Sequence, residues 1–380
     1  MITELIAAAS LSIWGYLVFA RGSFWRVRQE QAPVVVDASK ATVAVVIPAR
    51  NEAEVVGSAI QSLLQQDYPG ALRVFLVDDH SADATAGVAM RAAEEFGSAD
   101  LVTVLRAPQL PAGWTGKLWA VSQGIAQANS FQPDYLLLTD ADIVHAPNNL
   151  AQLVARARIE NFDLVSLMVR LQCHTLAERA LIPAFVYFFF MLYPPAWVGK
   201  SDRRTAAAAG GCILIRRSAL ERIGGIESIR DQIIDDCALA AKVKQNGRIW
   251  LGATVDSFSA RGYSTWTEIG RMISRSAFTQ LRHSAVLLVG TTVAMAVVFL
   301  APPLLLFVRS WAALAALAAW LLMTISFLPT LHLYKRSPLW APLLPLISVF
   351  YLGATIRSAI LYWRGRGGTW KGRVQDPMAT

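Results

Sequence analysis

Two long apolar runs near the C-terminal end limit the possible folds of this chain more than any other feature. Residues 286–308 and 311–330 contain 23 and 20 residues without a charge, and only Arg309 and Ser310 separate them. Each run is long enough for a helix to cross the hydrocarbon core of a bilayer, and so short a link joins the two helices as a hairpin. The sequence therefore predicts an integral membrane protein.

A third apolar segment, residues 5–20, lies at the N-terminal end, with Arg21 and Arg26 directly after it. A cleaved signal peptide carries its positive charge on the other side. We therefore predict that residues 1–22 form an uncleaved anchor and that the chain beyond it is cytoplasmic, as the positive-inside rule requires.

The membrane region is predicted to extend over residues 284–363, and its last segment can be placed in two ways. Residues 339–361 are apolar but contain Pro342 and Pro345. If they cross the membrane together with the other three segments, the basic tail 364–380 ends outside, against the charge rule. If they re-enter or lie flat, the tail stays in the cytoplasm, and this is the interpretation we prefer.

The positive charge of the chain is concentrated in this C-terminal part. The whole sequence has 35 Lys and Arg against 27 Asp and Glu, a net charge of +8, but residues 269–375 contain no acidic residue. Membrane phosphates are a better counter-ion than nucleic acid for basic residues among apolar segments, so we expect no nucleic-acid partner. The three cysteines are too few and too scattered for a disulfide framework or a zinc site, which favours a reducing compartment.

Residues 40–282 have mixed composition and are predicted to form one α/β domain. Strand-like apolar runs alternate there with helical segments, an order typical of a parallel sheet covered on both faces. The predicted strands are residues 43–47, 73–77, 101–105 and 135–138, and the predicted helices are residues 54–66, 82–96, 117–129 and 148–160. Ligands of such sheets bind beyond the carboxyl ends of the strands.

Polar residues follow three of these strands. They are Pro48, Arg50 and Glu52 after the first, Asp78, Asp79, Ser81 and Asp83 after the second, and Asp140 and Asp142 after the fourth. Ser81 or Asp83 is also a possible helix cap. Helix capping and solvated loops would explain any one group, but three groups at one sheet edge favour a binding site. An Asp-x-Asp triplet at a strand end suits Mg²⁺ or Mn²⁺ with ligand phosphates, so a nucleoside diphosphate is the expected ligand.

The motifs IPARNE, VDDHSADAT, GWTGKLWA, TDAD, GGCILIRR and IDDCALAAKVKQNG, in this order, resemble those of the family 2 inverting glycosyltransferases. The resemblance covers about residues 42–282 and is strongest to the hopene-associated glycosyltransferases, with ceramide glucosyltransferase more distant. It implies a GT-A fold, which is Rossmann-like with a mostly parallel sheet, between N- and C-terminal transmembrane helices. It also implies a bacterial inner membrane location with the catalytic domain in the cytoplasm.

The resemblance also implies residue roles. It places Pro48, Arg50 and Glu52 beside the nucleoside of a UDP-sugar, Asp78 and Asp79 at the uracil, Lys117 near the diphosphate, Asp140 at the ribose or metal, and Asp142 on Mg²⁺ or Mn²⁺. Asp236, with Asp235 before it, would be the catalytic base; the alternative is a pair of acids at a helix N-terminus. His145 could reach the metal, but a structural loop histidine bonded to backbone is the preferred interpretation.

The acceptor is less well defined by the sequence. Gly210 and Gly211 could let the backbone approach it closely, although a tight turn explains them equally well. Processive relatives have Gln-x-x-Arg-Trp; here residues 266–278 have Arg275 in the arginine place and Ser276 in the tryptophan place, which weakens the case for polymer synthesis. The resemblance implies that Arg275 helps to bind the donor diphosphate and that Trp266 lies at the acceptor. Residues 181–198 are uncharged and aromatic, and form either buried core or an interfacial element that leads an apolar acceptor to the base.

These inferences predict a metal-dependent inverting transferase that moves a sugar from a nucleotide diphosphate to a lipid hydroxyl, in hopanoid biosynthesis by the resemblance. Polysaccharide synthesis and transfer to polyprenyl phosphate are the alternatives within the family. A catalytically silent membrane scaffold that binds nucleotide sugar is the alternative from another class.

Overall fold

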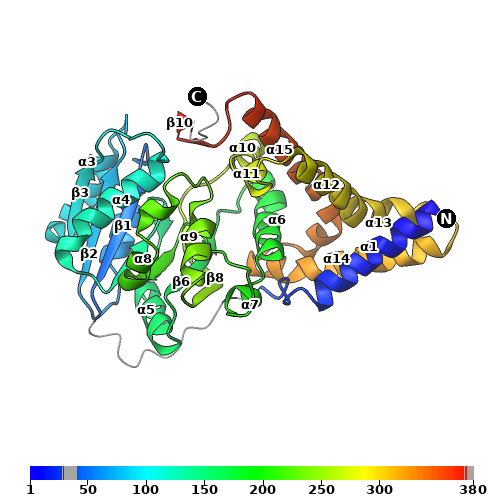
Figure 1. The fold of residues 1–380 in the computed structure, drawn as a ribbon, viewed down its shortest axis with the longest axis horizontal. Helices are drawn as coiled ribbons and strands as arrows, with labels where there is room; N and C mark the ends of the chain where they lie inside the picture. The colour runs from blue at the N-terminus through cyan, green and yellow to red at the C-terminus, as the bar shows by residue number, and fades with distance from the viewer. Residues whose placement is uncertain (28, 30–40, 372, 375–380) are drawn as a thin grey trace.

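The computed structural model describes residues 1–27, 29, 41–371 and 373–374. An α/β domain forms one end of the molecule and apolar helices form the other, with the N-terminus at the tip farthest from the sheet (Figure 1). Arg28, which follows the predicted anchor, and residues 372 and 375–380 of the predicted basic tail lie outside the described residues.

The α/β domain is built on an eight-stranded mixed sheet with the order β3-β2-β1-β4-β7-β6-β8-β5. The strands are β1 (Val43–Ala49), β2 (Leu72–Asp78), β3 (Val102–Arg106), β4 (Tyr135–Leu138), β5 (Ile143–Val144), β6 (Leu164–Arg170), β7 (Ile213–Arg216) and β8 (Ile249–Ser259). The first four in the spatial order are parallel, as predicted. Strand β7 runs antiparallel to both β4 and β6, so the sheet is mostly and not entirely parallel.

The predicted alternation of strands and helices is confirmed. All seven residues of β1 are buried, as expected for a central strand covered on both faces. The helices that follow β1 to β5 are α2 (Val56–Leu64), α3 (Thr85–Glu95), α4 (Gly116–Ala128) and α5 (Asn149–Ile159). The expected cap of α3 is wrong: its N-cap is Ala84, and Asp83 instead accepts a hydrogen bond from the Thr85 N–H at 3.1 Å.

The second half of the domain contributes shorter elements around β7 and β8. They are α8 (Arg217–Arg222), the 3₁₀ helix η3 (Ile226–Ile229), α9 (Asp235–Lys244), α10 (Trp266–Ser274) and α11 (Ala277–Gln280); η1 (Ala99–Leu101) and η2 (Asn129–Phe131) lie in the first half. Helix α10 begins with a capping box in which Thr265 and Glu268 satisfy each other's backbone N–H groups.

Among the described residues, five apolar helical segments are long enough to cross a membrane by length and composition. They are α1 (Ile2–Phe19); α6 (Leu176–Leu192) with α7 (Pro195–Val198); α12 (Ala285–Met295) with η4 (Ala296–Leu300), α13 (Ala301–Leu304) and η5 (Leu305–Phe307); α14 (Trp311–Leu333); and η6 (Pro338–Leu343) with α15 (Leu344–Trp363). A short antiparallel pair, β9 (Thr369–Trp370) and β10 (Arg373–Val374), follows α15. The predicted hairpin of residues 286–308 and 311–330 is present.

A proline in the hairpin fixes where α1 docks. Pro302 has no N–H, so the carbonyl of Val298 has no partner four residues later in the helix. The indole Nε1–H of Trp14, which is fully buried, donates to that carbonyl at 2.7 Å. Trp14 also packs edge-on against Phe299, with ring centroids 5.6 Å apart. The proline thus creates the polar site that α1 occupies.

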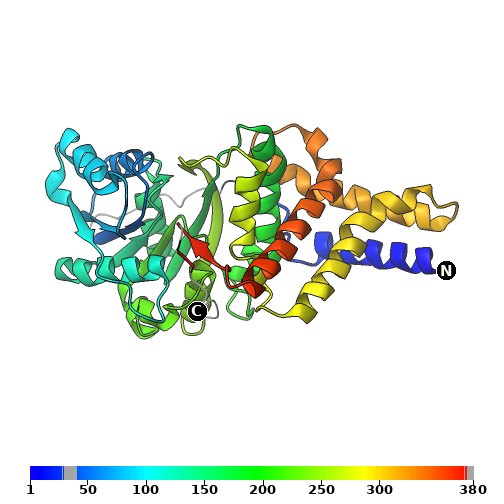
Figure 2. The ribbon, with the colours of Figure 1, turned by 90° about the horizontal axis from the view of Figure 1, so that it is seen from above.

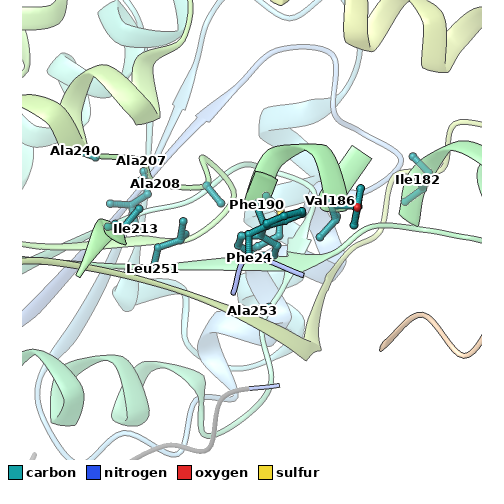
Figure 3. Packing of buried hydrophobic residues seen from close by; sticks show 14 of the residues in the cluster. Phe24, Ile182, Val186, Phe190, Ala207, Ala208, Ile213, Ala240, Leu251 and Ala253 are labelled. Atoms are coloured by element: carbon teal, nitrogen blue, oxygen red, sulfur yellow. The ribbon is translucent and has the colours of Figure 1, made fainter. Parts of the chain in front are cut away.

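Helix α6 joins the apolar helices to the sheet domain. It is continuous through Pro183, and it ends before Pro194 and Pro195. Figure 3 shows one continuous core in which Phe190 of α6 lies among Phe24, Ile213 of β7 and Leu251 of β8. On its other side the Tyr187 hydroxyl is 2.6 Å from the Ser326 hydroxyl of α14. Half of the residues in this segment are buried, and it packs against both the sheet domain and α14.

Candidate active site

The loops after β1 and β2 are hydrogen-bonded to each other at the carboxyl edge of the sheet. Asn51 has a left-handed backbone with φ of 53°, and its side-chain oxygen accepts from the Ala82 N–H at 2.8 Å. The Asn51 N–H donates to the Ser81 hydroxyl at 3.0 Å, and the Glu52 N–H donates to the Thr85 hydroxyl at 2.8 Å. These bonds fix the relative position of the two predicted donor-binding segments.

Asp78 and Asp79 have different surroundings at the carboxyl edge of the sheet. Asp78 accepts a hydrogen bond from the Ser81 N–H at 3.1 Å and thereby shapes its own loop. Asp79 is fully buried, and its carboxylate lies 3.5 Å from Nη1 of Arg50, which also donates to the Asp79 carbonyl. The structure therefore brings Asp79 and Arg50 together.

Lys117 joins carboxylates that come from two other parts of the chain. Its Nζ lies 3.0 Å from Oδ1 of Asp140, after β4, and 3.1 Å from Oδ2 of Asp235, at the start of α9. Lys117 is the second residue of α4, whose first turn is capped by Thr115. Burial disfavours the protonated form of Lys117 and by itself would lower its pKa. Attraction by Asp140, Asp235 and Asp236 outweighs this effect and raises the Lys117 pKa.

Asp236 is held directly beside this lysine cluster. Its Oδ2 accepts from the Gly210 N–H at 2.9 Å, and its Oδ1 accepts from the Cys237 N–H at 2.7 Å. Burial and the neighbouring Asp235 raise the pKa of Asp236 to about 6, although Lys117 opposes the shift. Asp235 and Asp236 are also the first two residues of α9, so they lie at the positive end of its dipole as the alternative interpretation expected.

Gly210 leaves little room for a side chain beside these groups. A Cβ at this position would lie 3.3 Å from Oδ2 of Asp236 and 3.4 Å from Nζ of Lys117. The carbonyl of Gly211 accepts from the Thr139 hydroxyl at 2.8 Å and so ties this segment to the end of β4. A cavity between these segments is lined by Pro48, Lys117, Asp140, Gly210, Asp235 and Asp236 together with apolar residues.

Asp142 belongs to a second group of charges on the same edge. Its Oδ2 accepts from the Ser259 hydroxyl at 2.6 Å and lies 4.0 Å from Nε of Arg261. Arg261 also pairs with Oε2 of Glu52. Burial and the negative charge of Asp140 raise the pKa of Asp142. Arg261 could not be predicted from the sequence, because a single arginine beyond β8 matches no motif.

The residues after β4 suit a divalent cation that also contacts a ligand. Asp140 and Asp142 repel each other, and a cation between them would relieve that repulsion. No group of three or more His, Cys, Asp or Glu among the described residues could hold an ion by protein contacts alone. Mg²⁺ is commonly bound by one or two carboxylates together with substrate phosphates, and this donor set fits that pattern.

Other predicted residues lie outside this charged network. Arg275 is exposed, and its electrostatic influence reaches Tyr263. Trp266 is 45% exposed and packs on Phe350 of α15, with ring centroids 5.9 Å apart. Nothing in these contacts ties either residue to the cluster around Lys117.

His145 is structural in its contacts, but its partners differ from those expected. Its ring lies 3.0 Å from the Thr139 hydroxyl and 2.9 Å from the Asn149 amide, so side chains and not backbone groups hold it. The residue is buried, and burial lowers its pKa to about 4. A neutral imidazole therefore connects the end of β4 with α5.

Comparison with known proteins identifies the fold and the family. The family described as "Glycosyltransferase like family 2" matches residues 40–254. The chain is 25% identical over 260 residues to "Probable glycosyltransferase YdaM" of Bacillus subtilis (strain 168), covering 67% of this chain and 55% of that protein. It is 30% identical over 188 residues to an "N-acetylglucosaminyltransferase" of Rhizobium leguminosarum bv. viciae, covering 47% and 40%. The chain thus spans about half the length of these curated relatives.

A solved structure extends the likeness to the apolar helices. The mannosyltransferase PcManGT from Pyrobaculum calidifontis, determined in complex with GDP-Man and Mn²⁺, superimposes with a TM-score of 0.57 at 21% identity, covering 94% of this chain and 99% of that one. This identity shows the fold alone. The family match over residues 40–254 covers more than half of the chain, which therefore belongs to the family described as "Glycosyltransferase like family 2" and has a GT-A fold.

Proposed function

We propose that this protein is a metal-dependent inverting glycosyltransferase that moves a sugar from a nucleotide diphosphate, UDP by the sequence resemblance, to the hydroxyl group of a membrane lipid. The observation that carries the proposal is the convergence of Asp140, Asp235 and Asp236 around Lys117. The cluster combines a carboxylate that can accept a proton with a cation that can pair with a leaving phosphate. Both are needed for a direct displacement at a sugar carbon.

In this proposal Asp236 is the general base. The acceptor hydroxyl oxygen attacks the anomeric carbon while its proton passes to a carboxylate oxygen of Asp236. The bond from that carbon to the donor phosphate oxygen breaks, and the electron pair leaves with the diphosphate. A single displacement inverts the anomeric centre. The Gly210 N–H, 2.9 Å from Oδ2, fixes the orientation of the base.

Lys117, Asp140 and Asp142 would act on the departing diphosphate. A divalent cation bound by Asp142 and Asp140 would neutralise the negative charge that grows there. The ammonium group of Lys117 lies 3.0 Å from Asp140 and can also donate a hydrogen bond to the same phosphate. Arg50 and Asp79 would hold the nucleoside, since they lie together in the loops after β1 and β2.

The surroundings of the base favour an apolar acceptor. Tyr193 follows directly after α6, and its hydroxyl shares a hydrogen bond with the thiol of Cys237, the residue after the base. The same hydroxyl accepts from the Gln280 amide at 2.6 Å, at the end of α11. An apolar helix that packs on α14 therefore ends beside Asp236. The resemblance to the hopene-associated enzymes suggests a hopanoid, which lipid mass spectrometry of cells with and without the protein would test.

Donor hydrolysis tests this function against a silent nucleotide-sugar scaffold. We expect purified full-length protein to hydrolyse a UDP-sugar slowly with Mn²⁺ and to lose that activity in Asp142→Ala, because the variant lacks the more buried of the two carboxylates after β4. Hydrolysis is measured as UDP released. No hydrolysis of any nucleotide sugar by the unaltered protein would favour the scaffold instead.

A second part of the proposal concerns topology in a bacterial inner membrane with the α/β domain in the cytoplasm. The Leu171 N–H, just after β6, donates to the Tyr334 hydroxyl at 3.3 Å, and Lys371 pairs with Glu52 at 2.7 Å. Both flanks of η6 and α15 thus contact the α/β domain. Figure 2 agrees, since α15 runs back toward the sheet while the ends of α1 and α13 point away. These contacts favour re-entry of residues 338–363 over crossing.

Thiol labelling tests this topology. Arg309→Cys, between α13 and α14, is expected to react with an impermeant maleimide in intact spheroplasts, whereas Arg366→Cys is expected to react only after lysis. Both arginines are exposed, while Cys173 and Cys212 are buried and Cys237 is partly buried, so labelling of the unaltered protein gives the background. Labelling of position 366 in intact spheroplasts would mean that α15 crosses the membrane.

The pH dependence of transfer provides another prediction. A base must be ionised to accept a proton, and burial raises the pKa of Asp236 to about 6. We therefore expect kcat/KM to be level above about pH 7 and to fall roughly tenfold per pH unit below 6. An acid limb with a midpoint near 4, the ordinary value for an aspartate, would contradict this assignment.

A further inference from the structure

The segment beyond α15 brings a lysine from the end of the chain onto the donor side of the sheet edge. Nζ of Lys371 lies 2.7 Å from Oε1 of Glu52 and donates to the Asn51 carbonyl at 3.3 Å. The Lys371 carbonyl in turn accepts from Nε of Arg50 at 3.4 Å. Three consecutive residues of the loop after β1 thus contact Lys371, whose side chain is only 22% exposed.

Glu52 holds two cations side by side. Its Oε2 pairs with Arg261 and its Oε1 with Lys371, so one carboxylate serves two positive groups. Arg50 lies at the same place and pairs with Asp79. The remaining acid in contact with Arg261 is Asp142, which the proposed metal would occupy. With the metal bound to Asp142, Arg261 and Lys371 share the single negative charge of Glu52.

The electrostatics of Lys371 agree with this crowding of positive charge. Burial, and then repulsion from Arg261, lower its pKa to about 8. The charges of Asp142, Asp83 and Asp140 act in the other direction, which places the ammonium group within electrostatic reach of the acids after β4. An anion bound between Lys371 and these acids, with a divalent cation at the acids, would reduce the repulsion between Lys371 and Arg261. It would also reduce the cost of burying the charge of Lys371.

We propose that Lys371 contacts the diphosphate of the bound nucleotide donor, so that the tail beyond the last membrane helix completes the donor site. This inference rests on the proposed function, because it requires a nucleotide donor at this sheet edge. Glu52 is then a positioning residue that holds Lys371 and Arg261 in place, and not a contact of the nucleoside as the sequence analysis expected. The ammonium group has three donors, so it can keep Glu52 and still bind a phosphate oxygen.

The contacts also explain why the lysine comes from this part of the chain. Helix α15 packs against α10 and α11 of the α/β domain, and the Ser358 hydroxyl accepts from the Phe278 N–H at 3.0 Å. The end of α15 is therefore fixed relative to the sheet, and the few residues between Trp363 and Lys371 reach the loop after β1. Donor binding is in this way connected to the helix that lies in the membrane region.

Nucleotide binding to full-length protein in detergent tests the inference. Dissociation constants for UDP and for UMP are measured with MnCl₂ by calorimetry, for the unaltered protein, Lys371→Gln, Lys371→Arg and the control Arg364→Gln. Arg364 carries the same charge in the same tail but is exposed. A hydrogen bond to a charged group contributes about 1.5–3 kcal/mol, so Lys371→Gln is expected to weaken UDP binding about tenfold to a hundredfold.

The comparison of the two nucleotides separates phosphate contact from a structural role. We expect UMP binding to change less than UDP binding in Lys371→Gln, partial recovery in Lys371→Arg, and no change in Arg364→Gln. Equal weakening for both nucleotides, or no weakening, would overturn the inference, and tighter binding would mean that the tail obstructs the site. If the unaltered protein binds neither UDP nor GDP with Mn²⁺, the proposed function itself fails.

Discussion

Replacement of Asp236 by Asn is expected to reduce sugar transfer by about 10²–10⁴-fold, the usual contribution of a general base. The amide has nearly the same shape and can still accept the hydrogen bond from Gly210, which is 2.9 Å away in the unaltered protein. It cannot take a proton from the acceptor. The binding constant for UDP with Mn²⁺ should therefore remain within about threefold of the unaltered value, while kcat falls.

A matched substitution controls for charge in the same region. Asp231→Asn removes an exposed acid a few residues before α9, and it should leave kcat unchanged. Undiminished turnover in Asp236→Asn would remove the proposed base. It would also favour an acceptor that is already ionised, such as polyprenyl phosphate, because that reaction needs no base.

Replacement of Lys117 by Met has the second largest expected effect. Methionine keeps most of the length of the side chain but removes the charge that joins Asp140 and Asp235. Loss of one preorganised cation at a developing negative charge costs about 10²–10³ in kcat. Lys117 also lowers the pKa of Asp236, so the acid limb of the pH profile should move above its value of about 6 in the unaltered protein.

The direction of that pH shift distinguishes an electrostatic role from simple damage to the fold. A misfolded fraction lowers kcat at every pH and leaves the midpoint in place. The control Lys200→Met removes an exposed lysine after α7 and should change neither kcat nor the midpoint. A fall in kcat with an unmoved acid limb would contradict the charge coupling between Lys117 and Asp236.

The alternation of strands and helices could be read from the sequence because it has a local cause. Apolar β-branched runs such as residues 43–47 bury both faces of a strand, and the polar residues that end them mark the carboxyl edge. Asp140 and Asp142 were predicted as site residues by the same reasoning, and Asp236 by a resemblance that is confirmed at the level of the family. The long apolar helices could also be predicted from the sequence, since length and lack of charge define them.

The direction of β7 could not be predicted from its residues. Strand β7 has four residues, of which three are apolar, and so short a run fits a parallel or an antiparallel neighbour equally well. Its direction depends on the path of the chain through α6 and α7, which the strand sequence does not contain. The continuity of α6 through Pro183 has a similar origin, because packing on both sides outweighs the local cost of the proline.

The sequence by itself determined the class of fold, the apolar segments and the acids at the strand ends, because each depends on residues close together in the chain. Only the tertiary structure placed Arg261 and Lys371 on Glu52, and Tyr193 beside Cys237. Arg261 and Lys371 are more than 200 residues from Glu52 along the chain. The residues next to a charged side chain in the sequence do not indicate a partner that far away. Such pairs form because burial at the sheet edge makes an unpaired charge costly.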